Sequence, residues 1–140
     1  MNATIEKFGY PATLVGEFEH WLVLLRPAQP TLGSLVLAAK SDATAYSTLP
    51  RAAFAEQADV IAAIERALAA SPGFERINYL MLMMVDPHVH FHVFPRYKGH
   101  RSFGSIELAD TGWPGPPDLQ SGQSIDADEF DRLRRQLAEI

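Results

Sequence analysis

Residues 88–94 read His88-Val89-His90-Phe91-His92-Val93-Phe94, a run in which histidine occupies alternate positions. Side chains alternate between the two faces of a β-strand, so this spacing predicts a strand with all three imidazoles on one face. Successive rings would stand about 6.6 Å apart, from a rise of about 3.3 Å per residue. The apolar residues between them would point to the opposite face, where they can pack against a helix.

Three imidazoles in one row can do several kinds of chemistry. Imidazole can act as a nucleophile, as a general acid or base, or as a metal ligand. Alternate histidines on a strand can also share a zinc ion, with nitrogen ligands at about 2.1 Å. A buried row with satisfied hydrogen bonds is the purely structural alternative, but burying three polar rings is costly without a purpose.

The rest of the chain predicts a sheet with helices packed on it. Pro50 is expected as the first residue of a long amphipathic helix over 51–70, which the breaker Ser71-Pro72-Gly73 ends. A second helix is expected after an Asp126 cap, with an apolar stripe of Phe130, Leu133, Leu137 and Ile140. The methionines of 81–84 are expected to fill gaps in the core. Apolar runs predict strands over 13–15, 20–25, 32–39, 77–84 and 88–94. This order predicts an α+β fold, a mainly antiparallel sheet with one long helix packed on it and a C-terminal helix.

Composition excludes several classes of protein. A length of 140 residues fits a single domain over 1–140, and the absence of cysteine excludes disulfides and thiolate catalysis. The formal charge of −5 argues against a nucleic acid duplex as partner. No secretory signal begins the chain, and no apolar run reaches the roughly 20 residues that span a bilayer. We therefore expect a cytoplasmic protein without a membrane partner.

At residues 88–94 the chain resembles the histidine triad (HIT) superfamily, whose signature is His-x-His-x-His followed by two apolar residues. Pro95-Arg96 continues the signature as in the fragile-histidine-triad-like branch, which includes bacterial HIT family hydrolases. Glu19-His20-Trp21 and Leu32-Gly33-Ser34-Leu35-Val36-Leu37 are similar to the first half of that branch. The resemblance covers residues 10–103 and implies a HIT-like fold. It leaves 104–140 as a C-terminal extension.

The resemblance also implies a reaction. His90 would attack the α-phosphorus of a nucleoside phosphate ester, an anhydride such as a dinucleoside polyphosphate, or a phosphoramidate, and form a covalent nucleotidyl-histidine. His92 would contact phosphate oxygens, and the His88 carbonyl would fix the tautomer of His90. No cofactor is required, although a divalent cation could accompany the nucleotide. The family also implies a homodimer whose sheets join side by side.

The chain departs from the family pattern around the site. Met83-Met84-Val85-Asp86-Pro87 stands where many members carry a phosphate-binding Gly-Gln-Ser/Thr-like stretch. Asp86 either orients a histidine or starts a turn before proline. The candidate substrate-binding residues are Arg26, Ser34 and Arg96. For the two arginines the alternative is an exposed position in a turn or loop.

Other functions and one loop remain open. A non-catalytic nucleotide-binding protein or a metal-binding histidine cluster is the competing function, whereas the chain is too short for the two-repeat uridylyltransferases. We also expect Trp113 near a pocket, either of its own protomer or of a partner. The alternative for Trp113 is an anchor packed on its own core.

Overall fold

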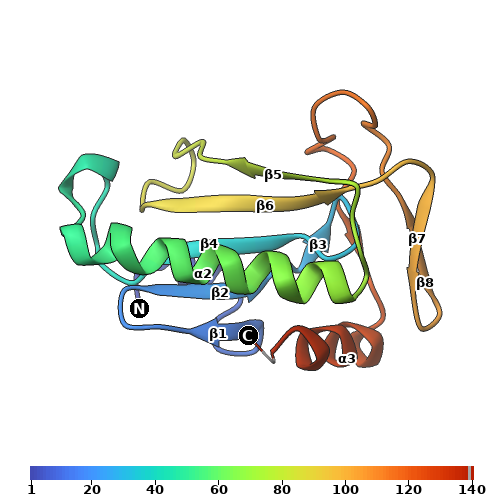
Figure 1. The fold of residues 1–140 in the computed structure, drawn as a ribbon, viewed down its shortest axis with the longest axis horizontal. Coiled ribbons are helices and arrows are strands. Elements are labelled where there is room, and N and C mark those ends of the chain that lie inside the picture. The colour runs from blue at the N-terminus through green and yellow to red at the C-terminus, as the bar shows by residue number, and fades with distance from the viewer. Residues whose placement is uncertain (139) are drawn as a thin grey trace.

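A five-stranded antiparallel sheet forms the centre of the fold (Figure 1). The computed structural model describes residues 1–138 and 140. The strands lie in the order β1-β2-β4-β6-β5. Their bounds are Leu14–Glu17 for β1, Trp21–Leu25 for β2, Leu35–Ala39 for β4, His90–Arg96 for β6 and Arg76–Leu80 for β5.

The remaining elements connect this sheet and cover it. A short two-stranded pair joins β3 to β9, and β7 and β8 form a separate hairpin. The bounds are Ala3–Lys7 for α1, Ala28–Gln29 for β3, Tyr46–Thr48 for the 3-10 helix η1, Arg51–Ala70 for α2, His100–Phe103 for β7, Ile106–Ala109 for β8, Gln123–Ser124 for β9 and Ala127–Leu137 for α3. No helix in the described part of the chain is both long and apolar enough to cross a membrane.

The central strands β2 and β4 are buried on both faces, which explains their almost wholly apolar sequences. Trp21 pairs with Ala39 and Leu25 with Leu35, so the two strands are in full register. One set of alternating side chains joins the main core under α2. The other set faces the opposite side and joins a second, smaller cluster of Leu22, Leu24, Val36 and Ala38 with Ile5 and Phe8.

Helix α2 covers one face of the sheet, over the residues that the sequence predicts (Figure 1). Its buried side chains include Val60, Ile64 and Leu68 in the main core. Pro50 is the N-cap, not the first helical residue, because its ψ of 153° is extended. Beyond the other end, Gly73 has a φ of +88° and donates its N–H to the Leu68 carbonyl at 2.8 Å, a conformation that favours glycine.

The opposite face is partly covered by α1, a helix that the sequence analysis does not predict. Asn2 caps α1, since its Oδ1 accepts a hydrogen bond from the Ile5 N–H at 2.9 Å. The Asn2 amide also donates to the Ser41 carbonyl at 3.0 Å. Ile5 and Phe8 then pack on β2 and β4. The cap is visible in the sequence, but a helix of five residues is too short to show a periodic apolar stripe.

The predicted strands differ from the structure at their ends. β4 begins at Leu35, where the prediction starts at residue 32, and β6 continues to Arg96, where the prediction ends at residue 94. β6 begins at His90, so His88 lies just before the strand and not within it. β5 ends at Leu80, where the prediction continues to residue 84. The chain leaves the sheet there, and Met83 takes a φ of 50° in the left-handed region. The core role expected of the methionines therefore holds for Met81 and Met83 but is wrong for Met84, which is 83% exposed.

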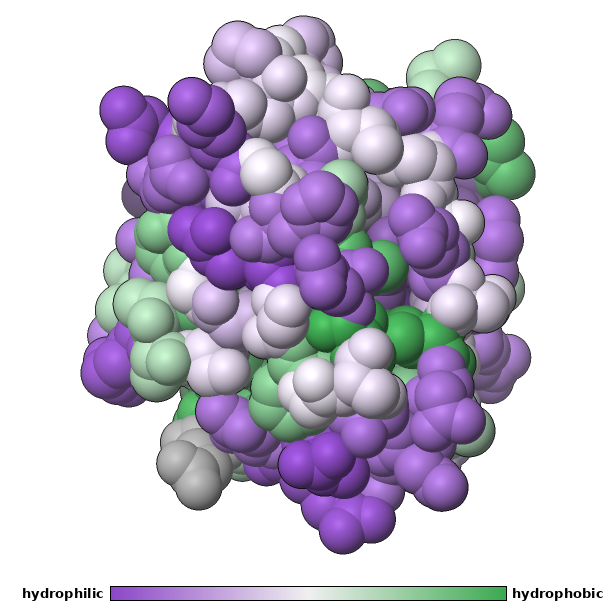
Figure 2. Space-filling model, turned by 90° about the vertical axis from the view of Figure 1, so that its right-hand side faces the viewer, coloured by the Kyte–Doolittle hydropathy of each residue, from purple (hydrophilic) through white to green (hydrophobic). Residues whose placement is uncertain are grey.

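Residues 104–140 end in the predicted helix. Asp126 caps α3 as expected and accepts hydrogen bonds from the N–H groups of Asp128 and Glu129. Leu133 and Leu137 of α3 belong to the main core. The end of the molecule at which the β7–β8 hairpin stands is mostly hydrophilic, with apolar areas near its centre and toward its edges (Figure 2).

Candidate active site at the histidine strand

Strand β6 places two histidines side by side on the face opposite α2. His90 lies across from Ala38, and His92 lies across from Val36. Their ring centroids are 5.1 Å apart and the rings meet edge to face. The face that carries these rings is therefore the one that α1 and Phe8 partly cover.

His90 is oriented by the backbone of its neighbour. Its Nδ1 lies 2.6 Å from the His88 carbonyl oxygen. A carbonyl can only accept a hydrogen bond, so Nδ1 carries the hydrogen and the neutral ring keeps a lone pair on Nε2. The residue is only 1% exposed, and it lines a cleft. The arrangement thus leaves one defined nucleophilic nitrogen.

His88 is held from the N-terminal helix. Its Nδ1 lies 2.8 Å from the Thr4 hydroxyl, 84 positions away in the sequence. This contact links α1 to the residue whose carbonyl orients His90. Nothing in the local sequence pattern points to Thr4, because the fold, and not the sequence around either residue, brings positions 4 and 88 together.

His92 is a buried, neutral imidazole. It is 7% exposed, and its Nδ1 has no hydrogen-bond partner among the described residues. Burial, with smaller contributions from Arg26 and His90, lowers the pKa of His92 to about 4. Phe94 stacks on the ring at 6.1 Å between centroids, and Phe8 meets it edge-on at 5.8 Å. A neutral imidazole carries one N–H, so His92 can donate one hydrogen bond to the oxygen of a bound ligand.

A cleft of about 340 Å³ opens beside these two rings, within the size range of small-molecule sites. Its walls come from α1, from the turn after β2 and from the loop between β5 and β6. The lining residues are Lys7, Phe8, Arg26, Leu82, Met83, Met84, Val85, Asp86, His90 and His92.

Arg26 is the cation in this cleft that lacks an ion-pair partner in the described part of the chain. Its Nε is buried without a hydrogen-bond partner, and its Nη1 donates weakly to the Ala28 carbonyl at 3.3 Å. The guanidinium lies 5.7 Å from the centre of the Phe94 ring, and burial lowers its pKa. Lys7, by contrast, pairs with Asp86 at 2.8 Å. An anion in the cleft would therefore meet Arg26 as its free positive charge.

Ser34 lies outside the cleft. It is fully buried, and its hydroxyl donates to the Thr31 carbonyl at 2.6 Å. This bond closes the turn that leads into β4, and Ser34 contributes nothing to the cleft lining.

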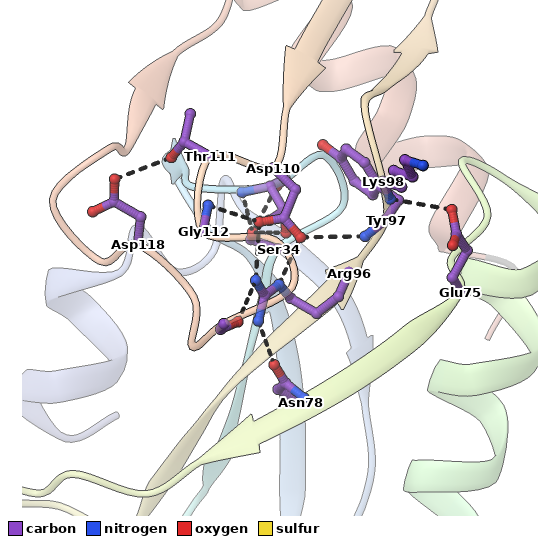
Figure 3. Close-up of polar contacts among 12 residues, drawn as sticks. Ser34, Glu75, Asn78, Arg96, Tyr97, Lys98, Asp110, Thr111, Gly112 and Asp118 are labelled. Carbon is purple, nitrogen blue, oxygen red and sulfur yellow. Dashed lines mark hydrogen bonds and ion pairs between the residues drawn. The ribbon is translucent and has the colours of Figure 1, made fainter.

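Arg96 is also outside the cleft, at the far end of β6. Figure 3 shows its guanidinium pointing at Asp110 and Asn78. It donates to the two Asp110 carboxylate oxygens at 2.7 and 3.0 Å and to Asn78 Oδ1 at 2.7 Å. Arg96 is 3% exposed, so this is a buried structural ion pair. Asp110 is a partner that the sequence analysis does not predict.

Trp113 lines a pocket, but a different one. That pocket has a volume of about 460 Å³ and includes Arg76, Asn78 and Arg96. The histidine rings are not among its lining residues. Within this chain, the Trp113 loop and the histidine cleft are thus separate features.

The described residues do not gather a metal site. Nowhere among them do three His, Cys, Asp or Glu side chains lie together in a way that could hold a metal ion. His90 and His92 share a cleft with one carboxylate, and that carboxylate is bound to Lys7.

Solved structures with the same architecture are histidine triad proteins. One from Sinorhizobium meliloti has a TM-score of 0.78 and 19% identity, matching 99% of this chain and 94% of that one. One from Bradyrhizobium japonicum has a TM-score of 0.75 and 19% identity, over 99% and 95%. A hypothetical histidine triad nucleotide-binding protein from Sulfolobus tokodaii has a TM-score of 0.73 and 17% identity, matching 97% of this chain and 87% of that one.

The chain has the histidine triad fold. The sheet, the long helix and the C-terminal helix match the predicted α+β arrangement. At identities below 25%, the likeness to these structures shows the fold alone. The chemistry of this chain has to be argued from the residues of its own site. No protein-family model matches the sequence, and no curated protein matches it significantly.

Proposed function

We propose that this chain belongs to the histidine triad superfamily, in its fragile-histidine-triad-like branch, and that it is a nucleotidyl hydrolase or transferase. It would act at the α-phosphate of a nucleoside phosphate ester, anhydride or phosphoramidate. The observation that carries the proposal is the 2.6 Å contact between His90 Nδ1 and the His88 carbonyl, which leaves Nε2 free as the nucleophile. No resident metal is needed, and any divalent cation would arrive with the nucleotide.

The reaction has two displacements at phosphorus. His90 Nε2 forms a bond to the α-phosphorus, while the bond from phosphorus to the leaving group breaks and the leaving group keeps the electron pair. Nδ1 keeps its hydrogen, which is donated to the His88 carbonyl in a hydrogen bond. The ring with phosphorus on Nε2 therefore carries a positive charge, which favours the second step. Water then attacks phosphorus, loses a proton and displaces Nε2. The products are the leaving group, a nucleoside monophosphate and the original neutral ring.

The other cleft residues stabilise the negative charge that grows on the phosphate oxygens. Arg26 supplies a charged donor that has no ion-pair partner in the described part of the free protein. His92 supplies a neutral N–H, in keeping with its lowered pKa. Fixed donors aimed at developing charge are usually a large part of catalysis. Ser34 and Arg96 drop out of the proposed substrate contacts, since both are engaged inside the protein.

The proposal includes a homodimer. β5 is an edge strand of the sheet, with its outer backbone groups unpaired in the described protomer. Such an edge can pair with the same strand of a second copy. Light scattering that gives the mass of one chain, 15.5 kDa, at micromolar concentration would count against it.

Replacing His90 tests the mechanism. His90→Ala should abolish turnover of a fluorescent adenylyl ester or amidate, whereas His100→Ala, at an exposed histidine of β7, should leave it intact. With an α-phosphorus-labelled nucleotide, an alkaline quench should retain an acid-labile label on wild type and on His100→Ala. Equal labelling of His90→Ala, or its normal turnover, would refute the mechanism. Binding without turnover by wild type would leave a non-catalytic nucleotide-binding protein.

A further inference from the structure

The proposed nucleophile is covered in this structure. His90 is 1% exposed and His92 is 7% exposed, although both line the cleft. The ring of Phe8 lies against them, with centroid distances of 6.1 Å to His90 and 5.8 Å to His92. An attacking nitrogen must come within about 3–3.5 Å of the phosphorus, and so little exposed surface leaves no room for a phosphate group there. A nucleotide therefore reaches His90 only if the segment that carries Phe8 moves.

An ion pair joins the two sides of the cleft. Lys7 is the last residue of α1, Asp86 belongs to the loop between β5 and β6, and both line the cleft. The Lys7 ammonium lies 2.8 and 3.1 Å from the two Asp86 carboxylate oxygens. Water reaches both partners, since their side chains are 53% and 18% exposed. Ion pairs of this kind are weak, so this one can break and form again in the folded protein.

The segment that carries Lys7 and Phe8 is held by its contacts and not by its own stability. α1 has five residues, far fewer than an isolated helix needs in water. Gly9 follows Phe8 with a φ of +95°, and glycine has more backbone conformations open to it than any other residue. Hinges in proteins are a few such residues at the ends of elements. The position of Gly9 therefore allows the segment to swing away from the sheet as a unit.

We propose that residues 2–8 form a lid over the histidine cleft, with Gly9 as its hinge and the ion pair across the cleft as its latch. Opening withdraws the Phe8 ring from the histidines and admits a ligand. Closure restores the contact between Thr4 and His88, so the residue that orients the nucleophile is held only when the lid is shut. The inference goes beyond the proposed function and rests on it only in naming the ligand as a nucleotide.

Access to His90 can be measured without assuming any enzymatic activity. Diethyl pyrocarbonate carbethoxylates neutral imidazole nitrogens, and mass spectrometry of the peptides gives its rate at each histidine. In wild type, His90 should react about 10- to 1000-fold more slowly than the exposed His100, since an open minor state is typically populated at about 0.1–10%. Asp86→Asn should accelerate the reaction at His90 about 1.4- to 5-fold, the factor to which an exposed ion pair corresponds. The matched control is Glu17→Gln, which breaks a surface pair with Lys40 at 3.0 Å and should leave the rate unchanged.

A removable tether tests whether the lid must open. The chain has no cysteine, so Lys7→Cys/Asp86→Cys offers the only two thiols to a short bis-maleimide whose spacer contains a disulfide. The tethered protein should lose both the reaction at His90 and the turnover of adenosine 5′-phosphoramidate. Reduction of the spacer cuts the tether in the same molecules and should restore both.

Each contrary outcome has a distinct meaning. Reaction of wild-type His90 as fast as His100, or of tethered His90 as fast as after reduction, overturns the lid, and so does undiminished turnover by the tethered protein. Failure of the two thiols to be tethered contradicts the approach of residues 7 and 86 across the cleft. Equal rates in Asp86→Asn and wild type overturn the ion pair as the latch. A tether that protects His90, in a protein whose wild type turns over no nucleotide, supports the lid and refutes the proposed function.

Discussion

Replacing Arg26 by methionine should separate catalysis from stability. In the free protein the guanidinium makes one long hydrogen bond, at 3.3 Å, and its buried Nε has no partner. Contacts with a phosphate would become charge-assisted hydrogen bonds, which contribute about 1.5–3 kcal/mol. Their loss corresponds to a decrease in kcat/KM of about 10- to 150-fold, at about 1.4 kcal/mol per factor of ten.

The free energy of unfolding should change little in the same variant. Methionine is unbranched and can keep much of the packing over Phe94, which the guanidinium now faces at 5.7 Å. Loss of the contact to Ala28 costs about 1 kcal/mol, and removal of a partly buried charge, whose pKa burial already lowers, offsets it. We expect a change below about 1 kcal/mol.

The assays are kcat/KM on adenosine 5′-phosphoramidate and the urea midpoint. A kcat/KM within twofold of wild type, or a large loss of stability, would refute our reasoning for Arg26.

Three further predictions concern Thr4, His92 and the buried ion pair of Arg96. Thr4→Val should lower kcat about fivefold by removing about 1 kcal/mol of hydrogen bonding to His88, whereas Thr48→Val, at an exposed threonine, should not; equal rates would exclude a positioning role for Thr4. The imidazole resonances of His92 should titrate with a midpoint near pH 4. Because an unfolded histidine has a pKa of about 6.5, the unfolded state binds more protons between these values, and the free energy of unfolding should fall as the pH drops through that window. A midpoint near 6.5 would contradict the argument from burial. Arg96→Ala should destabilise the fold by about 3–5 kcal/mol, because it leaves Asp110 buried and unpaired; an unchanged urea midpoint would show that the pair is dispensable.

The elements that the sequence predicts well are those with long, uniform patterns. Helix α2 matches its predicted bounds, because alanine-rich composition and the flanking prolines act locally. The strand ends are less accurate. Apolar character continues through Met84, but the backbone leaves the sheet after Leu80, which pairs with His92. Local composition does not encode where the pairing of two strands ends.

Part of the candidate site follows from the spacing of histidines, and part does not. Alternation places His90 and His92 on one face. The roles of Arg26 and Arg96 could not be separated in the sequence, since each is an arginine next to a proline. The difference comes from Asp110, which reaches Arg96 through the β7–β8 hairpin, while no acidic side chain reaches Arg26 in the described residues. The role of Thr4 could not be predicted either, because its partner His88 is distant in the chain.

Because Thr4 contacts His88, the activity at β6 should depend on how the amino-terminal segment is placed. That segment is held to the rest of the protein chiefly by the Asn2 amide, which donates to the Ser41 carbonyl, and by the buried Ile5 and Phe8. An affinity tag fused ahead of Met1, or a protease cut just after Lys7, could loosen it while the five strands and α2 stay folded. Such a protein would keep its sheet and α2 but melt at a lower temperature, because Ile5 and Phe8 lose their buried contacts, and its rate would be depressed. Activity measurements should therefore be made with tags at the other end or removed.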